Sequence, residues 1–233
     1  MFYVNNKTEL AKLYLSVIKK FNLKSSNYPI IQEYIKGEGW GVSCLYSRGV
    51  LKAKFTHKRL REKIYTGGSS TWRQSASNPL LENEAQLLLD SLKWHGIAMV
   101  EFKYDPIKKQ SWMIEVNPRF WGSLALAVHS GVDFPWLLYK MAIEGDIDPV
   151  LEYKLGVSAK WVLGELMALV NHFQKSPSKI GSIKEFIRMF KVDIYDDLRK
   201  DDLLPFLVQC FYYIKRLCLT KSMNPIEESM VQV

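Results

Sequence analysis

Two acidic side chains and one amide stand at spacings that could gather them around a metal ion. Glu101 lies in the run VEFKYD, and Glu115 and Asn117 lie in the later run WMIEVNPR. In a β-strand, side chains alternate between faces, so Glu115 and Asn117 point the same way. A hairpin joining the two runs would bring Glu101 opposite Glu115. Carboxylate and amide oxygens are hard ligands that suit Mg²⁺, which keeps several waters and often shares phosphate oxygens.

A solvated sheet face is the alternative interpretation, because antiparallel sheets often have one wet face. The apolar residues around the acidic positions favour partial burial instead; they are Ile97, Met99, Met113 and Ile114. Carboxylates in such surroundings need partners. Arg119, just beyond the second strand, could then complement phosphate oxygens in a bidentate manner.

The densest basic segment is KRLREK, residues 58–63. It could be a solvated strand end, or it could bring a cation to a phosphate group. The formal net charge of +8 over 233 residues also raises the class of nucleic-acid-binding proteins. The remaining positive residues are dispersed, and no interleaving of aromatic and basic residues is evident, so we expect no nucleic acid as a partner.

The hydrophobic and charged shares, 48% and 24%, are those of a globular protein and exclude a disordered or collagenous chain. No apolar stretch is long enough to predict a transmembrane helix, and the first residues, MFYVNNKTEL, do not have the pattern of a signal peptide. The three cysteines are scattered and odd in number, which favours a reducing, cytoplasmic location.

Hydrophobic periodicity and turn residues predict the elements that must position these side chains. Thr8 is a plausible N-cap for a helix over 8–21, and 66–71 is expected to be a flexible loop. The expected strands are 30–35, 42–46, 50–55, 97–104 and 112–116. The other expected helices are 79–92, 123–129, 134–144, 157–173, 183–190 and 204–219.

Three segments together resemble the ATP-grasp superfamily, which includes biotin carboxylase, carbamoyl-phosphate synthetase large chains and D-alanine–D-alanine ligase. EVNPR at 115–119 and VEF at 100–102 are similar to its metal-binding core, and IQEYIKG at 31–37 is similar to its adenine-binding hinge strand. The resemblance covers about residues 1–144 and is nearest to the carbamoyl-phosphate-synthetase-like carboxylate–amine ligases.

The resemblance implies an α+β fold, with an ATP-grasp C-terminal lobe of antiparallel sheet and helices followed by a mainly helical region. The expected domains are a partial ATP-grasp domain at 1–150 and a helical extension at 151–233. ATP and Mg²⁺ (or Mn²⁺) are the implied cofactors, and carboxylate and amine compounds of undefined identity are the implied substrates.

The same resemblance implies individual roles. Glu101, Glu115 and Asn117 would be metal ligands, and Arg119 and Arg61 would act on the phosphoryl group. The implied nucleotide-binding residues are Gln32, Glu33, Tyr34, Ile35, Glu38 and Ile114. Glu38 would bind the ribose hydroxyls, although members of the superfamily often carry that acid one position later, where this chain has Gly39.

Only about thirty residues precede the expected hinge strand, and they contain no glycine-rich flap. The sequence therefore predicts the C-terminal part of a C–N-bond-forming ligase, with a separate chain as a candidate source of the N-terminal lobe. A non-catalytic nucleotide-binding or partner-binding subunit is the alternative function.

Overall fold

The computed structural model describes residues 2–4, 6–64, 67–175 and 192–220. The chain divides into two compact units, Met1–Ile35 and Lys36–Val233, and each is described by itself. The helices and strands of the described residues are, in chain order, α1 (Lys7–Phe21), the 3₁₀ turn η1 (Ser25–Asn27), β1 (Glu38–Ser47), β2 (Val50–Ile64), β3 (Gly67–Ser75), α2 (Pro79–Ser91), β4 (Gly96–Asp105), β5 (Gln110–Asn117), α3 (Leu124–His129), α4 (Phe134–Glu144), β6 (Ser158–Lys160), α5 (Val162–Lys175), β7 (Ile194–Tyr195) and α7 (Leu204–Thr220).

The first unit contains α1 and an extended segment. Asn6, rather than the expected Thr8, caps α1, because its side chain accepts a hydrogen bond from the backbone N–H of Glu9 at 2.8 Å. The strand expected over 30–35 is wrong, since these residues have no regular secondary structure. A strand needs a neighbour for its backbone hydrogen bonds, and none of the described ladders includes this segment.

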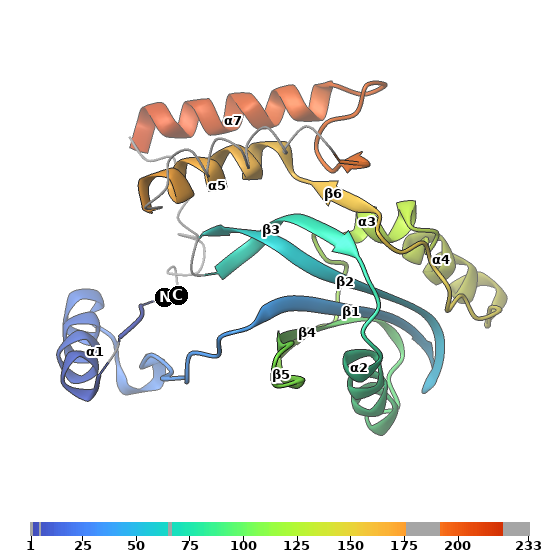
Figure 1. The fold of residues 1–233 in the computed structure, drawn as a ribbon, viewed down its shortest axis with the longest axis horizontal. Helices are drawn as coiled ribbons and strands as arrows, with labels where there is room; N and C mark the ends of the chain where they lie inside the picture. Colours follow the sequence, from blue (N-terminus) through green and yellow to red (C-terminus); the bar gives the residue numbers. More distant parts are fainter. Residues whose placement is uncertain (1, 5, 65–66, 176–191, 221–233) are drawn as a thin grey trace. The chain divides into compact units, whose positions relative to one another are not determined.

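The second unit is built on a seven-stranded sheet of the described residues, in the order β5-β4-β1-β2-β3-β6-β7 (Figure 1). All neighbouring strands are antiparallel except the β6–β7 pair. The β1–β2 hairpin closes at Arg48 and Gly49, which both have positive φ, at 47° and 85°. Two left-handed residues match the right-handed twist of the strands that they connect.

Each face of the sheet has its own core because successive side chains point to opposite faces. Helix α2 covers one face through Leu81, Ala85 and Leu89, which pack with β1 and β4 residues such as Val42 and Val100. Helices α3 and α4 cover the other face, where twelve buried residues including Phe55, Met99 and Phe134 form a second cluster. The second core ends at Met99, so the next residue on that face of β4, Glu101, lies just beyond it.

The segment expected to be a flexible loop at 66–71 instead lies mainly in β3, which pairs with β2 on one side and β6 on the other. Its Gly and Ser residues carry no apolar alternation, so the ladder could not be predicted from the pattern. The extension beyond residue 150 also differs from the expected helical unit, because β6 and β7 add to the same sheet. The chain divides after Ile35 rather than near residue 150.

Helices α5 and α7 lie side by side (Figure 1), joined by Trp161, whose Nε1 donates to Gln209 Oε1 at 3.4 Å and whose ring contacts Tyr213. The helices expected at 79–92, 123–129, 134–144 and 204–219 are present within a few residues of their predicted ends. The helix expected over 183–190 lies outside the described residues. None of the described helices has the length and hydropathy needed to cross a membrane.

Candidate functional site

The two acidic residues lie directly opposite each other on neighbouring strands. The β4–β5 register pairs Glu101 with Glu115 and Met99 with Asn117, so all three polar residues occupy one end of this ladder. The hairpin geometry expected from the sequence is therefore confirmed. Alternation along β5 gives Glu115 and Asn117 the same face, where Asn117 is buried and Glu115 is exposed.

Asn117 links the two carboxylates. Its Nδ2 lies 2.8 Å from Glu115 Oε1 and 3.3 Å from Glu101 Oε1. No three His, Cys, Asp or Glu side chains of the described ranges gather as in a metal centre, so the donor set here is two carboxylates and one amide. This set fits Mg²⁺ or Mn²⁺, because such ions take a few oxygen ligands from a protein and fill the rest of their coordination sphere with water and phosphate. Rotating the Asn117 amide would turn its oxygen toward the carboxylates.

Arg59 of β2 reaches across β1 to this acidic pair. Its Nη2 lies 2.5 Å from Glu101 Oε2, and its Nη1 lies 3.6 Å from Glu62 Oε1. Lys103 Nζ is 3.7 Å from the same Glu62 oxygen. The acidic pair is therefore bordered by two cations and a third carboxylate, so a polyanion and a metal ion would both find complementary charges here.

Two glycines of β1 leave the space that the Arg59 and His57 side chains occupy. A Cβ atom at Gly39 would lie 2.9 Å from Arg59 Cδ, and one at Gly41 would lie 2.5 Å from His57 Cε1. Gly41 pairs with Glu101 on one side and with His57 on the other. The side chains of Arg59 and His57 thus lie over Gly39 and Gly41, a strip of β1 that we call the glycine lane.

Partial burial changes the charge behaviour of Glu101. Desolvation raises the pKa of Glu101 above its ordinary value, the Arg59 guanidinium opposes that shift, and the Glu115 carboxylate adds to it. The carboxyl group is therefore held ionised mainly by a neighbouring cation rather than by water.

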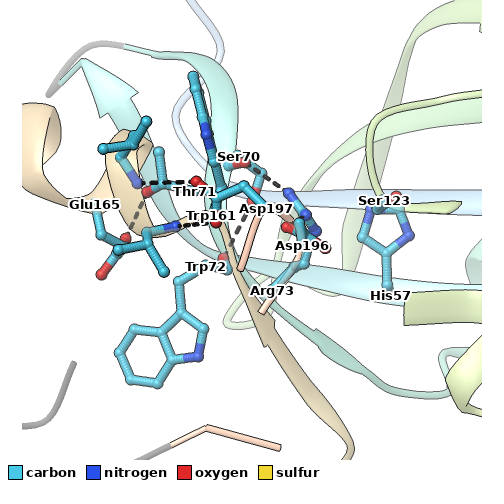
Figure 2. Close-up of polar contacts among 12 residues, drawn as sticks. His57, Ser70, Thr71, Trp72, Arg73, Ser123, Trp161, Glu165, Asp196 and Asp197 are labelled. Carbon is cyan, nitrogen blue, oxygen red and sulfur yellow. Dashed lines mark hydrogen bonds and ion pairs between the residues drawn. The ribbon is translucent and has the colours of Figure 1, made fainter. Parts of the chain in front are cut away.

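His57 lies next to this lane on β2 and is 2% exposed. Its Nε2 is 3.2 Å from Ser123 Oγ (Figure 2). Its ring stacks on Phe55. Burial, with smaller contributions from Arg59 and Arg73, lowers the pKa of His57 from 6.5 to about 3. His57 is consequently neutral near pH 7, and it ties β2 to the residue that precedes α3.

Arg61, expected beside the phosphates, is held elsewhere. Its Nη1 is 2.5 Å from Glu165 Oε2 of α5, and the Glu165 side chain is fully buried. Glu165 also accepts a hydrogen bond from Thr71 Oγ1 at 2.6 Å (Figure 2). A register shift between Arg59 and Arg61 interrupts the regular alternation of β2. Arg59 consequently turns to Glu101, whereas Arg61 turns to Glu165.

Asp196 and Asp197, which follow β7, lie beside β3 and the start of α5. Figure 2 shows Arg73 pointing toward Asp196, with which it forms an ion pair, and away from the ring of Trp72. Arg73 also donates to the Ser70 carbonyl at 2.8 Å. The adjacent Asp197 accepts hydrogen bonds from the first backbone N–H groups of α5, at Val162 and Leu163. Arg73 is therefore engaged by the chain itself.

The other expected site residues are more scattered. Arg119 is exposed beyond β5, and its Nη1 donates to the Phe120 carbonyl at 3.1 Å. Ile114, 52% exposed, lies at a register shift in β5. Glu38 forms an ion pair with Lys58 at 2.7 Å and accepts from Trp40 Nε1, on the face that α2 covers.

The expected adenine-binding residues Gln32–Ile35 belong to the first unit. Gln32, Glu33 and Tyr34 are exposed, and the Tyr34 ring contacts Tyr3 edge-on with centroids 5.3 Å apart. Gln32 also lines a cavity of about 300 Å³ with Ile30, Ile31 and residues of α1. The structure thus brings together Glu101, Glu115 and Asn117, and their individual roles stay predictions.

Arg59, Glu62 and Lys103 were missed as neighbours of the acidic pair. Alternation alone would have offered a signal for Lys103, two residues after Glu101. The choice between Arg59 and Arg61 needs the position of the register shift, which no residue type in KRLREK reveals.

Two solved structures are similar to the chain at low sequence identity. The biotin carboxylase domain of 2-oxoglutarate carboxylase from Hydrogenobacter thermophilus, solved with MgADP, ADP and bicarbonate, is 15% identical with a TM-score of 0.51. Biotin carboxylase from Campylobacter jejuni, solved with β-γ-ATP, is 19% identical with a TM-score of 0.49. Each alignment covers 66% of this chain and 36% of the other, so the chain spans little more than a third of their length.

No curated protein matches the chain. A family model does: the family described as "ATP-grasp in the biosynthetic pathway with Ter operon" matches residues 26–164. That range contains β1 to β6, the acidic pair and the glycine lane. With well over half of its residues matched and with the fold of the Hydrogenobacter domain, the chain belongs to this ATP-grasp family.

Proposed function

We propose that the chain binds ATP with Mg²⁺ or Mn²⁺ and contributes to ATP-dependent ligation of a carboxylate to an amine or similar nucleophile. The observation that carries this proposal is the convergence of Glu101, Glu115 and Asn117, with Nδ2 of Asn117 within 3.3 Å of both carboxylates. Membership of an ATP-grasp family supports the nucleotide. We place the reaction in the cytoplasm, where the three unpaired cysteines would remain reduced.

The proposed reaction has two steps. A substrate carboxylate oxygen attacks the γ-phosphorus of ATP, the bond from that phosphorus to the β–γ bridging oxygen breaks, and ADP leaves. The amine nitrogen then attacks the carbonyl carbon of the acyl phosphate, loses a proton, and inorganic phosphate leaves. Both steps move negative charge among oxygens, so fixed positive charge lowers their barriers.

Glu101, Glu115 and Asn117 would hold the divalent ion, which supplies charge neutralisation for the phosphates when bound. Arg119, whose Nη1 donates to the Phe120 carbonyl, would orient the acyl phosphate. Arg61 would act on the same group only after leaving the fully buried Glu165, whereas Arg59 already lies beside the acidic pair. Ile114, exposed at the register shift beside Glu115, would contact the nucleoside.

We propose further that a second lobe, from a separate chain, encloses the nucleotide. None of the residues of α1 is buried, although its apolar residues repeat at helical spacing. Leu15 and Phe21 are 66% and 42% exposed. The apolar stripe of α1 (Leu10, Leu13, Tyr14 and Val17) is half-buried and lines the cavity of about 300 Å³, so Leu15 and Phe21 are the side chains that a second lobe would cover.

Substituting Glu115 by Gln tests the metal and nucleotide part of the proposal. Glu115 is exposed, so the change should leave the melting temperature near that of the wild type while weakening Mg·ATP binding at least roughly tenfold. Isothermal titration of Mg·ATP into the full chain measures the affinity. Glu144→Gln, an exposed carboxylate of α4, is the matched control. Equal affinity in Glu115→Gln and wild type would contradict the proposal.

A partner-binding subunit without catalysis is the second candidate, and the outward face of α7 favours it. Five large apolar side chains there are exposed: Leu204, Leu207, Val208, Phe211 and Ile214. Trapping with hydroxylamine in the presence of Mg·ATP, candidate carboxylates and the second lobe separates the two functions. Hydroxamate formation indicates an acyl phosphate and hence catalysis, whereas nucleotide binding without hydroxamate indicates the subunit.

A further inference from the structure

The acidic pair already has a cation of its own. Arg59 Nη2 is 2.5 Å from Glu101 Oε2, on the side of that carboxylate away from Asn117, which donates to Oε1. Both oxygens of Glu101 are therefore engaged within the chain. A metal ion that bound Glu101 would have to take the place of one of these contacts.

We propose that Arg59 is an internal counter-ion that competes with the divalent cation for Glu101 and moves to the phosphates when metal and nucleotide arrive together. This inference rests on the proposed function, since it concerns the same metal site. It assigns to Arg59 the regulation of that site: the chain binds the free metal weakly and accepts it as a complex with ATP.

The geometry of Arg59 suits a side chain that changes partner. Gly39 leaves its stem room, because a Cβ there would lie 2.9 Å from Arg59 Cδ. Its Nε atom is buried and has no hydrogen-bond partner, and its second carboxylate, Glu62, is 3.6 Å away. One short ion pair thus holds a guanidinium that has five N–H donors. Phosphate oxygens would satisfy more of these donors than Glu101 does.

The local charges also favour exchange. Glu62, Glu101 and Glu115 face Arg59 and Lys103, so the cluster carries one uncompensated negative charge. A divalent ion added while Arg59 stays would crowd positive charge around Glu101. If Arg59 moves to the triphosphate, that crowding is relieved. Glu101 then pairs with the metal ion, and the phosphates pair with Arg59.

The test compares two ligands, Mn²⁺ alone and preformed Mn·ATP, on the full chain. Electron paramagnetic resonance of free Mn²⁺ measures the first affinity, and isothermal titration measures the second. Arg59→Gln should bind Mn²⁺ alone roughly tenfold more tightly than wild type, the factor for removing one close competing charge. The same variant should bind Mn·ATP no more tightly, or more weakly, because the phosphates lose their partner.

Lys54→Gln is the matched control, since it removes another charge of β2 whose partner, Glu82, lies on α2. It should behave as wild type with both ligands, and thermal melting verifies that both variants fold.

If Arg59→Gln binds Mn²⁺ as wild type does and Glu115→Gln abolishes that binding, the metal site stands and the counter-ion role is overturned. If neither wild type nor Arg59→Gln binds Mn²⁺, the metal site and the counter-ion role both fall. If Arg59→Gln binds Mn²⁺ and Mn·ATP more tightly than wild type by the same factor, the move of Arg59 to the phosphates is overturned.

Discussion

At the scale of single residues, burial fixes the protonation of His57 and makes it a source of pH-dependent stability. Its pKa is lowered to about 3 in the folded chain and is 6.5 for an exposed imidazole. Below pH 6.5 His57 binds a proton in the unfolded chain but not in the folded chain. The free energy of unfolding therefore falls as the pH falls from 6.5 toward 3. At pH 5 the loss amounts to about 2 kcal/mol.

His57→Gln should remove this contribution. The variant cannot titrate in this range, so the slope of its unfolding free energy between pH 7 and pH 5 should be shallower than that of wild type, by up to ~1.4 kcal/mol per pH unit. Urea denaturation at several pH values measures both slopes. His129→Gln, which replaces an exposed histidine of α3, is the control. Parallel slopes for His57→Gln and wild type would show that His57 is protonated in the fold.

The glycine lane makes a second prediction at this scale. Gly41→Ala places a Cβ 2.5 Å from the buried His57 ring, which cannot move aside without losing Ser123 and Phe55. We expect a loss of about 1–3 kcal/mol, typical of overpacking in a filled core. Gly122→Ala, whose Cβ would meet nothing within 4 Å, should change stability much less in the same thermal melts. Similar losses in both variants would argue against the steric account.

Much of the acidic pair could be predicted from the sequence, because strand alternation and hairpin spacing depend on neighbouring residues alone. Glu101 and Glu115 oppose each other as expected. The partner of Glu101 could not be predicted in this way. Arg59 and Arg61 are chemically identical, and only a register shift set by β3 decides which of them turns toward Glu101.

At the scale of elements, α5 begins where a distant aspartate accepts its first N–H groups. Asp197 Oδ1 accepts from Val162 N at 2.9 Å, and Oδ2 accepts from Leu163 N at 3.2 Å. Asp197→Ala should therefore cost about 1 kcal/mol, as the loss of a helix cap does. Asp201→Ala, which breaks an exposed pair with Arg199, should lower the melting temperature much less. Equal melting temperatures for the two variants would contradict the capping role.

Elements with strong local signals were predicted well, and elements defined by distant partners were not. Helices α2 and α4 have Pro in the first turn and a side-chain cap at Asn78 or Asp133, and their bounds lie close to those expected. β3 and β6 are strands because each finds a ladder on its neighbour. The segment at 30–35 has the composition of a strand and finds none. Strand pairing depends on distant parts of the chain, so local composition gave the wrong prediction for all three segments.

At the scale of the whole molecule, the chain carries a net charge of +8, but cations of the sheet are held in ion pairs. Six of the cations on β2 and β3 form ion pairs with carboxylates: Lys52, Lys54, Lys58, Arg59, Arg61 and Arg73. We therefore expect binding to a 20-base DNA or RNA to be weak at 50 mM salt and lost at 200 mM, measured by fluorescence anisotropy. Binding that persists at 200 mM salt would revive a nucleic-acid function.

The ion pair between Arg73 and Asp196 joins residues 123 positions apart. During synthesis on a ribosome, β1 to β3 emerge long before Asp196, so the buried guanidinium of Arg73 has no carboxylate from that segment while the early strands assemble. An unpaired buried charge is strongly unfavourable, which delays closure of this edge of the sheet until the later segment is released. The nascent chain should thus acquire its final protease resistance only after translation has passed β7.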